Sequence, residues 1–338
     1  MTIPNTFQAL RSFETEQQTV TRQLCQCTMD SLPQHEVLIQ VAYSSLNYKD
    51  ALSVTGHKGV TRHYPHTAGC DAVGIVVNSQ NSDFKQGDKV LVTGYDLGMN
   101  TDGGFAEYIC VPANWVVPLP QGLSLEQAMI YGTAGYTAAL SIYKLQQNGL
   151  TPEQGQVLVT GATGGVGSIA IAILTQLSYD VVAMTGKADK HDYLTQLGAK
   201  TIIGRDALAK TSKPLSKPQW AAVVDTVGGD SLISALKSVQ YGGSVSTCGT
   251  VAGTQLDTAV FPFILRGINL LGIASAESRR NIRLQLWSLL ANEWKISQWV
   301  PIAQYCTLTQ LDEIYIDKIL RGELYGRMVV EINPSIAS

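Results

Sequence analysis

Charge is scarce in this sequence. Lys, Arg, Asp and Glu together make up 15% of the 338 residues, and the formal net charge is −3. A chain with so little positive charge has no broad basic surface that would attract nucleic acid or an anionic membrane. We therefore expect neither as a partner, and an anionic small-molecule ligand has to be bound by local positive groups.

Long apolar runs and targeting patterns are also missing. No apolar run reaches the roughly 20 residues that span a membrane, and residues 1–11 lack the basic-then-apolar plan of a signal peptide. Low-complexity tracts are absent, and hydrophobic residues make up 45% of the chain. This composition is typical of a globular protein of about two domains, and we expect it to be cytoplasmic.

Metal-binding patterns are absent too. The six cysteines include no C-x-x-C pair, and the five histidines show no ligand spacing. Cys25 and Cys27 stand two apart, hence on one face of a strand, and we interpret them as small core or surface residues rather than metal ligands or half of a disulfide. The sequence therefore predicts no metal site.

The chain is organised around a glycine-rich turn at residues 161–167. An apolar run at 156–160 predicts a strand buried on both faces, and apolar residues at helical spacing follow the turn. In this context the first glycine permits a sharp turn, the middle ones let backbone amides approach a pyrophosphate, and the last lets the helix pack on the strand. A purely structural turn is the alternative. The residues expected to bind a dinucleotide here are Gly161, Thr163, Gly164, Gly165, Val166 and Gly167.

Strands and helices alternate after this turn, which predicts a doubly wound parallel sheet. Ligands of such sheets lie outside the carboxyl ends of the strands, where Thr185, Asp225 and Gly249 stand. The expected strands are 156–160, 180–184, 201–203, 220–225, 243–248 and 269–273, with helices after residue 166 and at 190–197 and 231–239.

The first 130 residues are mostly β. Short strands separated by glycine, proline and asparagine predict a compact barrel-like domain, and an apolar strand at 328–332, after a helix at 280–292, can rejoin it. We therefore expect a substrate domain of residues 1–130 and 275–338, with a nucleotide domain of residues 131–274 inserted. The expected strands are 37–41, 72–77, 89–92 and 105–111.

Two further stretches are candidates for chemistry. Asn47, Tyr48, Lys49 and Asp50 crowd four polar side chains into one turn, which is either a solvated helix start capped by Asn47 or a catalytic loop. Small residues at 132–137 interrupt a helix expected over 124–145. They indicate either close approach of a ligand or close helix packing.

The end of the second expected strand favours NADPH over NADH. NAD-binding chains usually carry an acid about twenty residues past the glycines, to accept from the ribose hydroxyls. Here that strand ends in Thr185, Gly186 and Lys187 without an acid, and Asp189 comes later. A hydroxyl, backbone amides and a lysine suit a 2′-phosphate, and Arg205, just past the third strand, can add a second cation.

These features resemble the medium-chain dehydrogenase/reductase superfamily over nearly the whole chain. Residues 45–51, 132–138 and 262–267 are similar to its zinc-free branch of quinone oxidoreductases, whose characterised members are NADPH-dependent acryloyl-CoA reductases. The resemblance implies an α/β architecture: a GroES-like β-barrel domain with an inserted Rossmann domain that binds NADPH (NADP+). It also implies a homodimer formed through strand 269–273.

The zinc sites of the superfamily are not reproduced. Its zinc alcohol dehydrogenases have a cysteine in the loop held here by 47–50, and a His-Glu pair where this chain has Cys70 and Asp71. Neither that cysteine nor that histidine is present. The four-cysteine lobe that holds structural zinc is missing as well, since only Cys110 lies in that region.

The resemblance also assigns roles to individual residues. Reduction of an unsaturated thioester places hydride on the β-carbon and negative charge on the thioester oxygen, which requires a hydrogen-bond donor and then a proton. Tyr48 is the candidate donor or orienting group, with Asn47 and Asp50 as its supports; a plain packing role is the alternative. For Arg327 the alternative is a surface arginine. The cofactor contacts implied outside the turns are Tyr48, Thr133, Gly249, Phe263, Ser275 and Arg327.

Two other functions remain open on the sequence. A quinone or enone reductase uses the same hydride but needs a wide apolar pocket and no site for the CoA phosphates. A catalytically silent NADPH-binding protein is the third possibility, and the intact polar turn at 47–50 argues against it. The walls of the substrate pocket come from loops such as 95–102, whose sequence does not decide between substrates.

Overall fold

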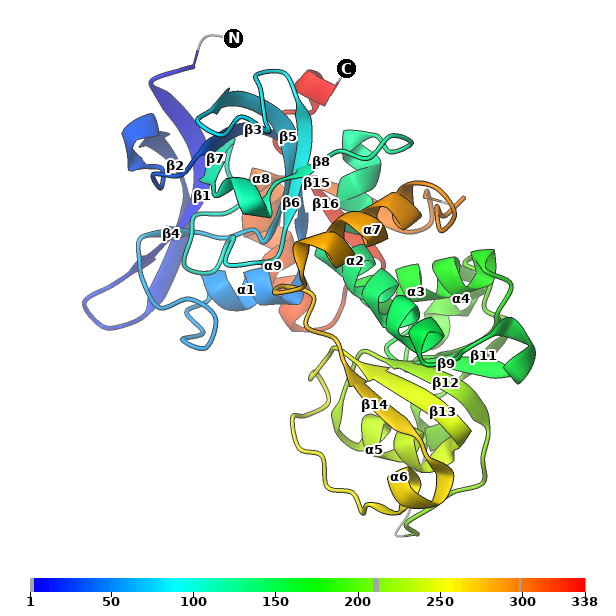
Figure 1. Ribbon diagram of the computed structural model, residues 1–338. Helices are drawn as coiled ribbons and strands as arrows, with labels where there is room; N and C mark the ends of the chain where they lie inside the picture. The colour runs from blue at the N-terminus through cyan, green and yellow to red at the C-terminus, as the bar shows by residue number, and fades with distance from the viewer. Residues whose placement is uncertain (1–2, 209–212, 298, 338) are drawn as a thin grey trace. The chain divides into compact units, whose positions relative to one another are not determined.

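The computed structural model describes residues 3–208, 213–297 and 299–337, which fall into two compact units (Figure 1). The first unit comprises the chain up to Thr133, Ala276–Ala291 and the chain from Ala303 onward; the second comprises Ala134–Ser275 and Asn292–Ile302. Residues 292–302 thus lie in the second unit, whereas we expected that unit to end at residue 274. No helix among the described residues is both long and apolar enough to cross a membrane.

The second unit is built on a parallel sheet of six strands in the order β11-β10-β9-β12-β13-β14. This order confirms the doubly wound sheet that the sequence predicts. Its strands are β9 (Gln156–Val159), β10 (Asp180–Met184), β11 (Thr201–Ile203), β12 (Trp220–Asp225), β13 (Val239–Thr247) and β14 (Asn269–Gly272). Its helices are α3 (Gly165–Gln176), α4 (His191–Gln196), α5 (Gly229–Ser238) and α6 (Phe261–Arg266).

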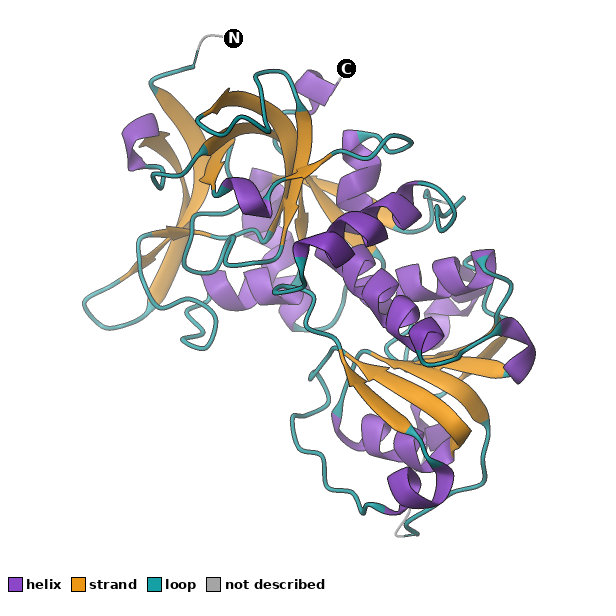
Figure 2. Cartoon of the chain, in the orientation of Figure 1, coloured by secondary structure: helices purple, strands orange, loops and turns teal. Residues whose placement is uncertain are grey.

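Burial explains why these strands lack alternating polarity. Every residue of β12 is buried, and Val157, Leu158 and Val159 of β9 are 0% exposed, as expected for central strands covered on both faces. Figure 1 shows α3 and α4 on one face of the sheet and α5 and α6 on the other, and Figure 2 shows the sheet between these two helical layers. The core on the α5 side includes Leu158, Val223 and Leu236.

The first unit is mainly antiparallel β. One sheet has the order β15-β16-β3-β5-β6-β8, with β7 also paired to β3, and a second has the order β2-β1-β4. Because β16 pairs with β3, the C-terminal strand rejoins the N-terminal domain as predicted. The strands are β1 (Thr6–Glu14), β2 (Val20–Thr28), β3 (Val37–Leu46), β4 (His66–Thr67), β5 (Asp71–Ser79), β6 (Lys89–Thr93), β7 (Tyr108–Val111), β8 (Val117–Pro118), β15 (Ala303–Thr307) and β16 (Arg327–Glu331).

Helices complete the first unit. The apolar core beneath α1 includes Leu46 and Val54, and it also includes Leu311 and Ile316 from the C-terminal helical segment. The long helix α2 (Leu125–Gln147) belongs to the first unit up to Thr133 and to the second from Ala134. It is interrupted at Gly132, whose φ of 50° and ψ of −155° are not helical. The helices are α1 (Tyr48–Val54), α7 (Arg280–Ala291), α8 (Leu308–Gln310) and α9 (Ile316–Leu320), with a π-helical turn at Leu311–Tyr315.

Candidate active site

The polar turn predicted from the sequence joins β3 to α1. Asn47 is extended, and α1 begins at Tyr48, so Asp50 is the third residue of the helix. The Asp50 carboxylate accepts hydrogen bonds from the backbone N–H of Asn47 at 2.8 Å and of Cys70 at 2.8 Å. An acid at this position satisfies a backbone donor at the helix start. Asp50 is therefore a buried structural support of the turn, 1% exposed.

Asp71, the first residue of β5, accepts more hydrogen bonds than Asn47 or Asp50, the two residues that we expected to support Tyr48. Its carboxylate accepts from Ser45 Oγ at 2.6 Å and Asn47 Nδ2 at 2.8 Å. It also accepts from the backbone N–H of Thr133 at 2.8 Å and from Thr133 Oγ1 at 2.6 Å. The side chain is 0% exposed, and a buried carboxylate persists only with such partners.

Arg327, the first residue of β16, supplies the positive charge. Its Nη2 lies 3.6 Å from Asp71 Oδ2 and donates to Ser45 Oγ at 2.6 Å, while Nη1 donates to Asn47 Oδ1 at 3.1 Å. The remaining bonds run to the carbonyls of Leu46 and Ile130. At 3% exposure it is not the surface arginine we considered, because its guanidinium is bound within the first unit. The cofactor contact implied for Arg327 stays a prediction.

Gly132 makes room for this cluster. A Cβ atom at Gly132 would lie 2.5 Å from Asp71 Oδ2, 2.6 Å from Ser45 Oγ and 2.8 Å from Arg327 Nη2. Its φ of 50° is also a conformation that favours glycine. The interruption turns the N–H of Thr133 away from the helix and onto Asp71. Of the two interpretations of residues 132–137, close packing thus holds at Gly132.

Tyr48 differs from its neighbours because it is exposed. Its side chain is 42% exposed, and the described residues offer its hydroxyl no hydrogen-bond partner. A solvent-accessible phenol beside a buried polar cluster can meet a small molecule. The structure therefore brings Asn47 and Asp50 together as supports and leaves Tyr48 available.

Burial changes the acidity of two groups in this cluster. Desolvation, followed by the charge of Asp71, raises the pKa of Asp50 to about 6. Desolvation, followed by the charges of Asp50 and Asp71, raises the pKa of the Cys70 thiol well above its usual value. Cys70 is 4% exposed, so it is a neutral thiol rather than a nucleophile. Among the described residues no group of three or more His, Cys, Asp or Glu is placed to hold a metal ion.

The second unit carries the predicted glycine turn between β9 and α3. A Cβ at Gly161, where φ is 58°, would lie 2.3 Å from Thr226 Oγ1, and a Cβ at Gly167 would lie 2.4 Å from the carbonyl oxygen of Gly161. The first N–H groups of α3, from Gly165, have no partner within the helix. The turn therefore fits the phosphates of a dinucleotide: it is open, lined by backbone amides, and at the positive end of a twelve-residue helix.

The residues predicted to select NADPH lie together at the end of β10. The side chain of Thr185 accepts from the backbone N–H of Lys187 at 3.0 Å. A Cβ at Gly186 would lie 2.6 Å from Arg205 Nε, so the guanidinium of Arg205 packs on that glycine. The chain thus places two cations beside one turn, a donor set that suits a 2′-phosphate.

The other predicted cofactor residues have structural neighbours in the second unit. Gly249 lies so close to Thr226 that a Cβ would be 1.8 Å from its carbonyl oxygen. Phe263 packs on the apolar core of the sheet, and Ser275 Oγ accepts from Thr137 Oγ1 at 2.9 Å. Their contacts with a cofactor stay predictions.

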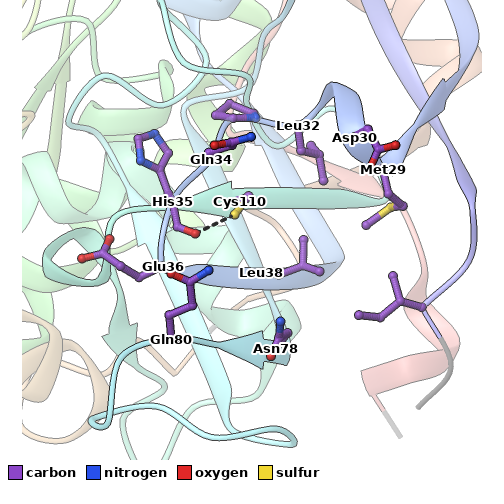
Figure 3. A pocket seen from close by; sticks show the side chains of 12 residues that line it. Met29, Asp30, Leu32, Gln34, His35, Glu36, Leu38, Asn78, Gln80 and Cys110 are labelled. Atoms are coloured by element: carbon purple, nitrogen blue, oxygen red, sulfur yellow. Dashed lines mark hydrogen bonds between the residues drawn. The ribbon is translucent and has the colours of Figure 1, made fainter.

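One cavity of the first unit lies away from the residues predicted to act. It has a volume of about 780 Å³ and is lined by residues of the first unit, among them Asp30, His35 and Glu36 (Figure 3). The Cys110 thiol closes one side by donating to the His35 carbonyl at 3.3 Å. The described residues that line it include acids but neither lysine nor arginine, so this cavity does not suit a phosphate-bearing ligand.

Sequence reasoning missed three members of the cluster, namely Ser45, Cys70 and Asp71. We noted Cys70 and Asp71 only as departures from a zinc site. The available signal was the acid at the start of an otherwise apolar strand, since a buried carboxylate needs partners. No local pattern identifies those partners, because they come from Ser45, Thr133 and Arg327.

Known proteins resemble the chain in both units. Residues 33–121 match the alcohol dehydrogenase GroES-like domain family, and residues 165–292 match the zinc-binding dehydrogenase family. The chain is 46% identical to the Bacillus subtilis protein YhfP, which carries the provisional name quinone oxidoreductase, over 96% of this chain and 99% of the other. It is 45% identical to the acrylyl-CoA reductase AcuI of Ruegeria pomeroyi, over 91% and 93%.

Solved structures agree with these similarities. The Salmonella enterica yhdH oxidoreductase in complex with NADP superposes with a TM-score of 0.93 at 40% identity, covering 96% of this chain and 99% of the other. The B. subtilis yhfP structure, with NAD bound, superposes with a TM-score of 0.94 at 45% identity, covering 97% and 100%.

We expect the Asp50 carboxyl to affect stability in a defined pH range. A carboxyl whose pKa is raised in the folded chain stabilises the fold fully below its unfolded pKa, near 3.8, and loses that contribution as pH rises through about 6. Asp50→Asn should therefore remove about 3 kcal/mol of pH dependence from the free energy of unfolding across this range. Denaturant unfolding at a series of pH values measures it.

Asp83→Asn is the control for this experiment, because Asp83 is an exposed carboxylate of the same unit. It should leave the pH dependence as in the wild type. The same dependence in wild type and Asp50→Asn would contradict the expectation.

Proposed function

The chain belongs to the medium-chain dehydrogenase/reductase superfamily, in its zinc-free, quinone-oxidoreductase-like branch, and we propose that it is an NADPH-dependent reductase of small enoyl-CoA thioesters. Acryloyl-CoA, reduced to propionyl-CoA, is the substrate we favour. The similarity to the R. pomeroyi acrylyl-CoA reductase over 91% of this chain carries the proposal. The exposed phenol of Tyr48 on a buried, hydrogen-bonded support is consistent with it.

The residues of the chain have distinct tasks in this reaction. NADPH supplies the hydride that is added to the β-carbon of the thioester. The turn at 161–167 binds the pyrophosphate, and Thr185, Lys187 and Arg205 bind the 2′-phosphate. Tyr48 donates a hydrogen bond to the thioester oxygen, where negative charge develops before the α-carbon takes up a proton. Asn47 and Asp50 hold the turn that carries Tyr48.

A quinone or enone is the second candidate substrate, supported by the provisional name of YhfP. Oxidation of NADPH with acryloyl-CoA, crotonoyl-CoA and a panel of quinones distinguishes the two. The enoyl-CoA proposal requires the largest kcat/KM with a thioester. Activity with quinones alone would support the second candidate, and binding of NADPH without turnover would support a catalytically silent protein.

We also propose a homodimer formed through β14. This strand is at the edge of the six-stranded sheet, and no other strand of the described part of the chain pairs with its outer side. In the preceding helix α6, Ile264 is 67% exposed and Leu265 is 57% exposed. An apolar surface beside an open strand edge suits a second copy of the chain.

Leu265→Asp should convert this dimer to a monomer, because it places a charge in an apolar interface. Light scattering measures the mass of each form. Lys85→Asp, a change at an exposed position of the first unit, should leave the mass unchanged. A wild-type protein with the mass of one chain would contradict the proposal.

We expect Lys187→Ala to weaken NADPH binding by about 10- to 100-fold and to leave NADH nearly unchanged. A charge-assisted hydrogen bond contributes about 1.5–3 kcal/mol, and only NADPH carries the phosphate that accepts it. Titration calorimetry with both cofactors measures the difference. Lys200→Ala, at a side chain 67% exposed in the same unit, is the control. Equal weakening of both cofactors would instead assign Lys187 to the pyrophosphate or to the fold.

Tyr48→Phe should lower kcat for acryloyl-CoA by at least about 10-fold, because a preorganised donor contributes about 2.7–4 kcal/mol and water replaces part of it at an exposed site. NADPH affinity should change less than the rate, since the hydroxyl acts in the transition state. Stopped-flow mixing of substrate with the NADPH complex separates the two quantities. Tyr241→Phe, at a side chain 82% exposed, should have no effect. An unchanged hydride-transfer rate in Tyr48→Phe would refute the chemical role.

A further inference from the structure

Asp71 takes no direct part in the proposed reaction, yet it is the most heavily hydrogen-bonded carboxylate of the first unit. We infer that Asp71 is a positioning residue, which fixes Asn47 and thereby sets the place of the Tyr48 phenol. This inference rests on the proposed role of Tyr48. It adds a residue that neither the sequence motifs nor the chemistry of the reaction singles out.

The position of the Tyr48 side chain is set by the backbone that carries it, because no described residue holds its hydroxyl by a hydrogen bond. Its hydroxyl has no hydrogen-bond partner among the described residues, and its side chain is 42% exposed. The preceding residue, Asn47, is held from both ends of its amide: Nδ2 donates to Asp71 at 2.8 Å, and Oδ1 accepts from Arg327 at 3.1 Å. Asp71 therefore controls Tyr48 through the residue directly before it.

The amide of Asn47 has more acceptors than hydrogens. Its Nδ2 lies 2.8 Å from Asp71 Oδ2, 3.2 Å from Asp50 Oδ2 and 3.3 Å from Cys70 Sγ. The Ser45 carbonyl oxygen lies 3.2 Å away as well. A primary amide donates two hydrogens, so these acceptors compete. The shortest contact, with Asp71, decides which way the amide turns.

Only a carboxylate satisfies the donors that meet at Asp71. Hydroxyls of Ser45 and Thr133, the amide of Asn47 and the backbone N–H of Thr133 all donate to its two oxygens. An asparagine at this position would keep one acceptor oxygen but replace the other with an NH2 group. That group donates and cannot accept, so some of these donors would lose their partner. It would also leave the buried charge of Arg327 without its counter-charge.

The carboxylate has little room to move. A Cβ on Gly132 would already be 2.5 Å from Asp71 Oδ2, so the backbone of the α2 interruption closes that side. On the other side lie Ser45 and Arg327. Because the acceptor, Asp71, cannot move, the side chain of Asn47 that donates to it is held in one orientation. Preorganised catalysis requires such rigidity of the residues that support the reacting group.

The test is a double-mutant cycle between Asp71→Asn and Tyr48→Phe. Asp71→Asn alone should lower kcat for acryloyl-CoA by at least about 10-fold at saturating NADPH. In the Tyr48→Phe background the same change should lower kcat by less than about 2-fold, because residues that act through one group are not additive. If the fall in kcat in the double variant equalled the product of the falls in the two single variants, the inference would be overturned.

A second measurement does not depend on activity. With 3-fluorotyrosine at position 48, Asp71→Asn should shift and broaden the ¹⁹F resonance in the absence of substrate. Asp88→Asn is the control, since that carboxylate accepts a backbone N–H from Lys85 in a turn before β6, and it should leave the resonance unchanged. An unchanged resonance in Asp71→Asn would overturn the inference.

If Asp71→Asn does not fold, Ser45→Ala replaces it. This variant removes one donor to Asp71 and should shift the resonance in the same direction by a smaller amount; no shift would overturn the inference. A wild-type protein inactive on acryloyl-CoA refutes the proposed substrate and leaves the fluorine result to decide the positioning role, so the two failures are distinguishable.

Discussion

The buried ion pair between Asp71 and Arg327 is the constraint on which the first unit depends. Burying two charges costs several kcal/mol for each ion unless hydrogen bonds satisfy them. Here the carboxylate and the guanidinium are both surrounded by partners, drawn from β3, β5, β16 and the interruption in α2. Four distant parts of the chain are thus joined at one point, and the turn that carries Tyr48 begins there.

Local patterns predicted the second unit well. The apolar strands, the glycine turn and the helices that follow it are contiguous in sequence, so each βα unit carries its own signal. Strands β10, β11 and β12 have the predicted bounds, whereas β13 begins at Val239 instead of residue 243. Lys187 and Arg205 could be named together as candidate phosphate ligands because each follows a strand of the same sheet, and the structure brings Arg205 against Gly186; their contact with a phosphate stays a prediction.

The first unit was predicted less completely because its order comes from distant pairing. Strands β1, β2, β4, β8 and β15 were missed, and β3 runs to Leu46 rather than ending at residue 41. In β2, polar residues obscure the alternation of apolar and polar side chains that identifies a strand, because β2 is at the edge of a three-stranded sheet. Asp71 was missed for the same reason: its partners Ser45, Thr133 and Arg327 are far apart in the chain, and only the fold brings them together.

The state of Cys70 matters for an enzyme of electrophilic substrates. Acrylic thioesters and quinones both react with thiolates by conjugate addition, and a cysteine in the supporting cluster is a target for such self-alkylation. Cys70 is poorly suited to this reaction because it is buried, and because burial, followed by the charges of two neighbouring carboxylates, raises the pKa of its thiol. The burial that makes these carboxylates depend on their hydrogen bonds therefore also keeps the thiol away from an electrophile.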